Sequence, residues 1–381
     1  MNKNTIQFSL PYIVGKELHY ITQSLLEKRL SGDGPFTKRC SNWLEQYTNR
    51  ALLTHSCTAA LEMASLLLKI KPGDEIIMPS YTFVSTANAF VLQGGIPVFV
   101  DIRKDTFNLD EKRIEAAITS KTKAIVPVHY AGVACEMDAI MSIAKQHNLQ
   151  VIEDAAQGVM ATYKGKALGS IGHLGAYSFH ETKNIISGEG GALLVNDPSL
   201  TLEAEIIREK GTDRSQFLRG EVDKYTWQTT GSSFLPSEMI AAFLWAQLEQ
   251  ADKITKLRLA CWNYYHEQLL PLERAGVLRR PIVPAQCQHN AHMYYVLLAP
   301  EICRQMVLES LKQNGIHAVS HYVPLHSSKA GKRYGKTYGS LTLTDSLSAR
   351  IIRLPLWVGL STAQQDRVIE QLAKVLNLVS C

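Results

Sequence analysis

Hydrophobic positions in the first two thirds of the chain alternate between two periods. Short apolar runs, typical of buried β-strands, lie at 51–56, 74–81, 97–102, 123–130, 150–156, 175–180 and 191–197. Segments with helical spacing of apolar residues occur at 58–70, 110–118 and 137–148. Strands that alternate with helices predict a mostly parallel sheet covered on both faces. The run at 191–197 follows the one before it too closely for a helical crossover, which predicts an antiparallel hairpin or a locally reversed strand.

The pattern changes at Ser237. Residues 237–270 have the spacing of one or two long helices. A smaller mixture follows, with a strand-like run at 293–300, a helical pattern at 302–315, an extended segment at 316–326 and an amphipathic helix at 361–378. We therefore expect an α/β protein with two domains. A large domain with a mixed, mostly parallel sheet would span 1–250, and a smaller α+β domain would span 251–381.

Composition places the chain among ordinary globular proteins. Of 381 residues, 46% are hydrophobic and 20% are charged, which excludes a disordered tail protein. Lys and Arg exceed Asp and Glu by 40 − 35 = 5, a mild excess that suits a small anionic substrate and gives no argument for nucleic acid. No run approaches the ~18 apolar residues of a membrane span, and the N-terminus has no apolar signal core.

The cysteines and histidines predict neither a disulfide framework nor a metal site. Seven cysteines are scattered without a CxxC pair, and this pattern of cysteines is typical of a protein in a reducing cytoplasm. His289 and His292 are three residues apart, but no acidic or cysteine ligand lies near them in the sequence.

Two charged residues near predicted strand ends suggest a cofactor. Asp154 lies in the run at 150–156, just after its apolar residues 151–152, and no turn residue follows it, which indicates a packed carboxylate with a partner rather than a solvated sheet edge. Lys183 lies in a glycine-containing loop, where a solvated charge is the usual finding. Together they suit pyridoxal phosphate (PLP), which needs a lysine for a Schiff base and a carboxylate beside its pyridine nitrogen.

PLP also needs a phosphate cup. The segment Ser56-Cys57-Thr58 ends a predicted strand and opens a predicted helix, where amide groups and the helix dipole favour an anion. Plain N-capping by Ser56 or Thr58 needs no ligand and is compatible with that role. Ser178 could add a hydroxyl, or simply satisfy a backbone bond. Phe83 could stack on the cofactor ring, although a core aromatic is the ordinary interpretation of such a residue.

Seven motifs occur in an order that closely resembles the DegT-type sugar-nucleotide aminotransferases. They are LSGDGPFTKRC (30–40), SCTAALEMA (56–64), MPSYTFVSTANAF (78–90), VHYAGVACEMD (128–138), EDAAQGV (153–159), SFHETKN (178–184) and GEGG (188–191). The similarity runs through nearly the whole chain. It implies the fold-type-I architecture of PLP-dependent transferases, PLP as cofactor, and a homodimer in which each subunit completes its neighbour's site.

The resemblance also implies roles for individual residues. Lys183 matches the Schiff-base lysine and proton shuttle, and Asp154 the partner of the pyridine nitrogen. Gln157 matches the residue beside the ring hydroxyl, and Phe83 the aromatic platform. The phosphate cup matches Cys57, Thr58 and Ser178.

One position departs from the family pattern. Many members carry G-x-N-x-R-M where this chain has GSSFLP at 231–236, so Ser233 replaces the asparagine that reaches the partner's phosphate and Leu235 replaces the arginine. Ser233 keeps one hydroxyl for that contact, with a shorter reach.

The segments 208–227 and 231–239 resemble the dTDP-4-amino-4,6-dideoxygalactose transaminase subgroup. This implies transfer of an amino group from L-glutamate to dTDP-4-keto-6-deoxy-D-glucose, giving dTDP-4-amino-4,6-dideoxy-D-galactose and 2-oxoglutarate. Such a product serves surface polysaccharides such as O-antigen or enterobacterial common antigen. The substrate contacts suggested by position are Arg214, Arg219, His321 and Tyr322, with Arg208, Lys210, Arg214 and Arg219 forming either a diphosphate clamp or a solvated helix face.

Several alternatives stay open. The same chemistry could give a gluco product, or use a 3-keto sugar or another nucleotide. Related dehydratases lack the Schiff-base lysine, so Lys183 argues against dehydration. The alternative from another class is a non-catalytic protein that binds PLP or a sugar nucleotide.

Overall fold

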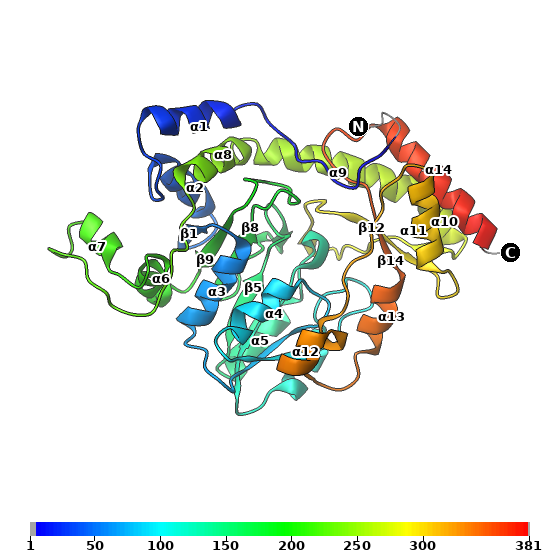
Figure 1. The fold of residues 1–381 in the computed structure, drawn as a ribbon. Helices are drawn as coiled ribbons and strands as arrows, with labels where there is room; N and C mark the ends of the chain where they lie inside the picture. The colour runs from blue at the N-terminus through cyan, green and yellow to red at the C-terminus, as the bar shows by residue number, and fades with distance from the viewer. Residues whose placement is uncertain (1–4, 380–381) are drawn as a thin grey trace.

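A computed structural model describes residues 5–379, with side chains described to residue 376, so the segment MNKN and Cys381 lie outside it. Its centre is an eight-stranded sheet in the order β1-β9-β8-β5-β4-β2-β3-β13 (Figure 1). The strands are β1 (Arg50–Thr54), β2 (Glu75–Pro79), β3 (Ile96–Val100), β4 (Thr122–Ile125), β5 (Gln150–Asp154), β8 (Leu174–Ser178), β9 (Gly191–Val195) and β13 (Lys336–Thr337). Only β9 runs against the others, pairing antiparallel with β8 and with β1. The mixed, mostly parallel sheet and the reversed strand at 191–195 are therefore confirmed.

Strands such as β2 and β9 are mostly apolar because both faces of the sheet are buried there. Successive residues of one strand enter different cores: Leu53 and Ile77 face one hydrophobic cluster, and their neighbours Leu52 and Ile76 face the other. The first cluster is covered by α2 (Pro35–Leu44), α5 (Met137–Gln146) and α8 (Glu238–Leu248), and the second by α3 (Cys57–Leu67), α4 (Val84–Val91) and α6 (Thr201–Arg208). The helix α1 (Glu17–Leu26) lies against α8.

The segment 110–118 differs from its predicted helix. It forms two 3₁₀ turns, Glu111–Arg113 and Glu115–Ala117, and no α-helix. Hydrogen bonds anchor both ends of this short segment. Asp110 N donates to Asp101 O before it, and Thr119 N donates to Thr122 Oγ1 at the start of β4. The 3₁₀ geometry, with its greater rise per residue, spans this short anchored connection.

Beyond α8, the long helix α9 (Ala251–Gln268) leads to a second core. There α10 (Leu270–Arg274), α11 (Arg304–Gln313) and α14 (Thr362–Val379) surround a three-stranded sheet of β10 (Leu278–Arg279), β12 (Tyr294–Leu298) and β14 (Ile351–Leu354). Two later strands pair with strands from the first part of the chain. β13 joins the large sheet beside β3. β11 (Cys287–Gln288) pairs with β6 (Thr162–Tyr163), and β6 also pairs with β7 (Lys166–Ala167). Helices α12 (Lys329–Tyr334) and α13 (Thr342–Arg350) precede β14.

The N-terminal segment belongs spatially to this second core. Ile6 is buried there and forms a parallel bridge with Ile316. No helix in the described part of the chain is long and apolar enough to cross a membrane. The division at residue 250 remains a proposal.

Candidate active site

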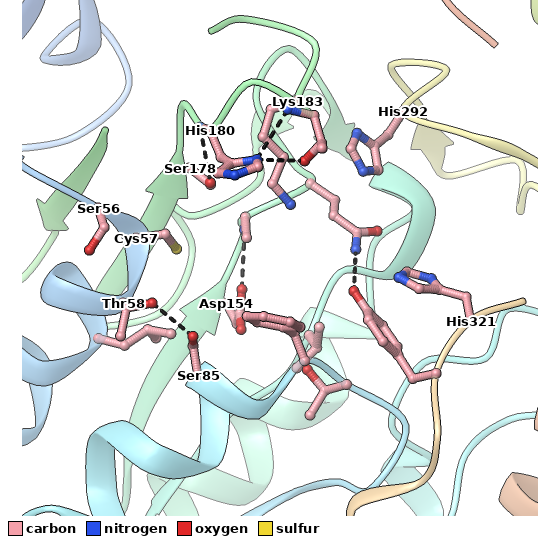
Figure 2. Close-up of a pocket in the computed structure, with 18 of the residues that line it drawn as sticks. Ser56, Cys57, Thr58, Ser85, Asp154, Ser178, His180, Lys183, His292 and His321 are labelled. Carbon is pink, nitrogen blue, oxygen red and sulfur yellow. Dashed lines mark hydrogen bonds between the residues drawn. The ribbon is translucent and has the colours of Figure 1, made fainter. Parts of the chain in front are cut away.

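A cavity of about 490 Å³ lies at the carboxyl ends of the parallel strands. The large sheet supplies Asp154 at the end of β5, Ser178 at the end of β8, and Ser56 after β1. The opposite wall comes from later parts of the chain, including His292, His321, Tyr322 and Arg353. Figure 2 shows the arrangement, with Ser56, Cys57 and Ser178 to one side, Lys183 and Asp154 in the middle, and His292 and His321 on the other side. This is the edge at which open parallel sheets bind ligands.

Asp154 is a packed carboxylate. It is only 6% exposed, accepts a hydrogen bond from Thr86 Oγ1 at 2.7 Å, and accepts another from Ala156 N at 3.2 Å. Thr86 belongs to α4 and is bonded in turn to Thr82 Oγ1 at 2.8 Å. The solvated sheet-edge alternative is therefore wrong, because Asp154 is buried with partners.

Lys183 lies in the loop between β8 and β9 and points into the cavity (Figure 2). The loop is held by its own backbone, with Lys183 N bonded to His180 O at 2.9 Å and Ser187 N to Phe179 O at 2.7 Å. Burial lowers the pKa of Lys183 below 10.5, although Cys57 and Asp154 oppose this and Arg353 adds to it. A lowered pKa increases the fraction of free amine, which is the form that attacks a carbonyl.

The start of α3 has the features of a phosphate cup. Ser56 Oγ accepts from Ala59 N at 3.1 Å, so Ser56 does cap the helix. Within the described residues, no acceptor bonds the amides of Cys57 and Thr58. Thr58 Oγ1 lies 2.7 Å from Ser85 Oγ, a cavity residue that the sequence did not reveal. Capping and anion binding are thus compatible at this helix start.

The glycine-rich loop packs directly on this cup. A Cβ at Gly191 would lie 2.4 Å from Cys57 N, so only glycine allows the two backbones to approach so closely. Ser178, at the end of β8, lines the cavity, and its Oγ accepts from His180 N at 3.4 Å. The donors here suit the phosphate of PLP, and Asp154 with Lys183 suits its ring and aldehyde, so the residues fit the cofactor.

Gln157 and two aromatic residues line the next part of the cavity. Gln157 accepts from Ala131 N at 2.6 Å and donates to Tyr322 OH at 3.1 Å. The ring of Tyr322 lies 6.4 Å from that of Phe83, measured between centroids. Phe83 is 58% exposed, so the core-aromatic interpretation is wrong for it.

Two imidazoles face Lys183 across the cavity. His292 Nδ1 lies 3.1 Å from Asn184 Oδ1, and His321 Nδ1 lies 3.2 Å from Tyr130 OH. Burial lowers the pKa of both histidines, and the charges of Lys183 and Arg353 lower it further. Both rings are therefore neutral and can donate or accept a hydrogen bond at neutral pH.

Sequence reasoning named His321 and Tyr322 but missed other cavity residues: Phe8, Ser85, His180, His292 and Arg353. It also missed Thr86, for which the one available signal was the spacing of Thr82 and Thr86 by one helical turn. The sequence spacing of His292 and His289 raises only the question of a metal site, and the described residues contain no group of three side chains able to hold a metal ion.

Three predicted residues lie away from this cavity within the chain. Ser233 is exposed and forms a bridge with Glu209. Arg214 pairs with Glu209 at 2.8 Å and Arg219 with Glu205 at 2.7 Å. Helix α7 (Arg214–Leu218) projects away from the body of the molecule (Figure 1). The structure therefore shows ion-paired arginines here and brings no diphosphate clamp to the chain's own cavity.

Comparison with known proteins gives one consistent result. Residues 11–373 match the model of the DegT/DnrJ/EryC1/StrS aminotransferase family. The chain is 33% identical to GDP-perosamine synthase of Caulobacter vibrioides, over 97% of this chain and 98% of that protein. It is 30% identical in sequence to S. venezuelae DesV, whose crystal structure was solved in complex with a ketimine intermediate. The two structures match with a TM-score of 0.88 over 98% of this chain and 99% of that one. A candidate sugar aminotransferase of Streptococcus pneumoniae, solved in its PMP form, is 27% identical with a TM-score of 0.90 over 98% and 100% of the chains.

Proposed function

Because this chain belongs to the DegT/DnrJ/EryC1/StrS aminotransferase family and is a PLP-dependent sugar aminotransferase, we propose that it aminates dTDP-4-keto-6-deoxy-D-glucose. The amino donor is L-glutamate, and the products are dTDP-4-amino-4,6-dideoxy-D-galactose and 2-oxoglutarate. The main support for this reaction is that Lys183, Asp154 and the start of α3 line the same cavity. Subgroup resemblance in 208–227 and 231–239 supports this particular sugar.

We propose roles for the cavity residues from their positions and from the family resemblance. PLP, when bound, supplies an electrophilic aldehyde and a ring that accepts electrons. Asp154, held by Thr86, keeps the pyridine nitrogen protonated, while the amides of Cys57 and Thr58 and the hydroxyl of Ser178 hold the phosphate.

Lys183 moves the protons. Its Nζ takes the proton from the α-carbon of the amino donor and later delivers one to C4 of the sugar. The lowered pKa of Lys183 suits both transfers. Phe83 and Gln157, which line the cavity, would hold the ring, and the neutral His321 with Tyr322 would contact the sugar.

We further propose a homodimer with shared sites. The segment 212–230 exposes large apolar side chains, including Trp227 at 81% and Leu218 at 61%. An exposed apolar arm of this kind is typical of a surface that docks on another subunit. Docking would bring Arg214, Arg219 and Ser233 toward the partner's cavity. The described cysteines are free thiols, which suits our proposal of a cytoplasmic enzyme.

A second candidate substrate is the corresponding GDP-linked 4-keto sugar. The 33% identity to GDP-perosamine synthase over nearly the full length favours it. The two candidates share the amination step and differ in the nucleotide.

The test is NMR of the product formed from PLP, L-glutamate and dTDP-4-keto-6-deoxy-D-glucose. A small H3–H4 coupling, from an axial amine at C4, supports the proposed product. A large coupling, from an equatorial amine, replaces it with the gluco product. If no amino sugar forms with dTDP but one forms with GDP in the same assay, the second candidate is correct.

A further inference from the structure

Arg353 occupies a fixed place in the wall of the active-site cavity. It lies on β14, where its backbone pairs with Tyr295 of β12 and with Val319, bonding the latter at 2.7 and 3.1 Å. Its guanidinium lies 4.6 Å from the centre of the Phe8 ring. Strand pairing on two sides and the aromatic ring together hold the cation at the cavity.

The guanidinium of Arg353 has no hydrogen-bond or ion-pair partner among the described residues. Three described arginines have a buried Nε without a hydrogen bond, namely Arg208, Arg279 and Arg353. The other guanidinium nitrogens of two of them do have partners. Arg208 pairs with the Asp33 carboxylate at 2.7 Å, and Arg279 donates to Lys104 O at 2.5 Å. Among the described residues, nothing bonds or ion-pairs with the guanidinium of Arg353, although it alone of the three lines the cavity. A buried donor without an acceptor is costly, and a ligand with two oxygens would remove that cost.

The charges around Arg353 favour the binding of an anion. Its charge reaches Lys183, His292 and His321, and lowers the pKa of each. Two carboxylates line the cavity and both have other partners. Asp154 is engaged with Thr86 and Ala156, and Glu189 lies 3.5 Å from His180 Nε2. Arginine binds carboxylates through two parallel hydrogen bonds, so its planar fork suits a carboxylate substrate.

We propose that Arg353 binds the α-carboxylate of the amino donor. This rests on the transamination proposed above and names the residue that recognises its donor. The α-carboxylate is attached directly to the carbon whose proton Lys183 takes, so it must lie close to Lys183 Nζ. The diphosphate of the acceptor is attached to C1, on the opposite side of the sugar ring from the reacting C4, and so lies farther from Nζ.

The test is the donor half of the reaction, measured without any sugar. Holoenzyme is mixed with L-glutamate or with L-glutamine, which shares the α-carboxylate but has no second one, and the cofactor absorbance is followed. Loss of a hydrogen-bonded charge pair predicts that Arg353→Met lowers kcat/KM about 100-fold for both donors. Arg353→Lys should recover part of that loss. Arg279→Met is the matched control, since Arg279 also has a buried, unbonded Nε but lies outside the cavity, and it should change kcat/KM less than about threefold.

A binding measurement separates recognition from turnover. The donor analogue 2-methyl-L-glutamate has no α-proton, so its dissociation constant can be read from the absorbance change alone. It should rise about 100-fold in Arg353→Met, with the thermal midpoint of the protein unchanged. The rate of the sugar half-reaction, in which PMP enzyme reacts with the keto sugar nucleotide, should stay within about threefold of wild type.

Three results would overturn the proposal. An equal loss in the sugar half-reaction would assign Arg353 to the diphosphate. A loss with L-glutamate but not with L-glutamine would assign it to the side-chain carboxylate. No loss in either half would leave it only packing against Phe8. A wrong acceptor sugar does not affect the donor test, and if L-glutamate is not the donor, the same comparison holds for any amino acid, since all share the α-carboxylate.

Discussion

Replacing Thr86 by valine removes one hydrogen bond to Asp154 and preserves the shape of the side chain. Thr86 is fully buried, and its Oγ1 donates to Asp154 Oδ2 at 2.7 Å. A hydrogen bond to a charged group contributes about 1.5–3 kcal/mol, which corresponds to roughly 10- to 150-fold in an equilibrium constant. If Asp154 holds the pyridine nitrogen, the dissociation constant of PLP should rise by at least about tenfold in Thr86→Val.

The chain offers a matched control for this substitution. Thr344 is equally buried, and its Oγ1 donates to Asp101 Oδ1, also at 2.7 Å, away from the cavity. Thr344→Val should therefore lower the free energy of unfolding without changing PLP affinity. PLP binding is measured by absorbance titration of the apoprotein, and unfolding by urea denaturation of each variant.

Two outcomes would refute the reasoning. Unchanged PLP affinity in Thr86→Val would show that this hydrogen bond does not orient Asp154 for the cofactor. An equal loss of affinity in Thr344→Val would show that general destabilisation, rather than the contact with Asp154, weakens PLP binding.

Three further predictions concern individual side chains. Lys183→Ala should abolish amino-sugar formation while the circular dichroism spectrum stays native, and retained turnover would remove Lys183 from its proposed role. Asp154→Asn should lower kcat by about 10²–10³-fold even where PLP still binds, and unchanged turnover would contradict its pairing with the pyridine nitrogen. Burial and the nearby His266 lower the pKa of His289 to about 4, so the folded protein resists protonation there and loses stability as the pH falls from 6.5 towards 4. His289→Gln should reduce the drop in unfolding free energy between pH 7.5 and pH 5 by about 2 kcal/mol, measured in urea at fixed protein concentration, and an undiminished drop would contradict this.

Much of the large sheet could be predicted because its strands are buried on both faces. Burial of this kind leaves a mostly apolar run in the sequence, as at β2 and β9. β5 has only two apolar residues, because its buried end carries Glu153 and Asp154. The edge strand β13 has two exposed residues and leaves no such run, and its pairing with β3 depends on a distant return of the chain. The helical pattern at 110–118 failed for a related reason, since anchored ends rather than local spacing set its conformation.

The candidate site also contains residues that the sequence could reveal and residues that it could not. Asp154, Lys183 and Cys57 could be predicted because strand ends and helix starts are local features, and parallel strands place such ends at one edge. Whether each performs its assigned chemistry remains a prediction. Thr86 and Arg353 could not be found, because their importance comes from contacts made by folding. Arg353 is meaningful only beside Lys183 and Phe8, which are far from it in the sequence.

The pairing of residues near the two ends of the chain determines when the cavity can close during synthesis. Chains emerge from the ribosome N-terminus first, so Ile6 and Phe8 are made long before their partners. Ile6 cannot pair until Gly315 and His317 have followed, and Phe8 has no guanidinium to contact until Arg353 has been made. The nascent chain thus holds the cup, Asp154 and Lys183 by the end of β9, but its cavity stays open to solvent until nearly the last residues are added.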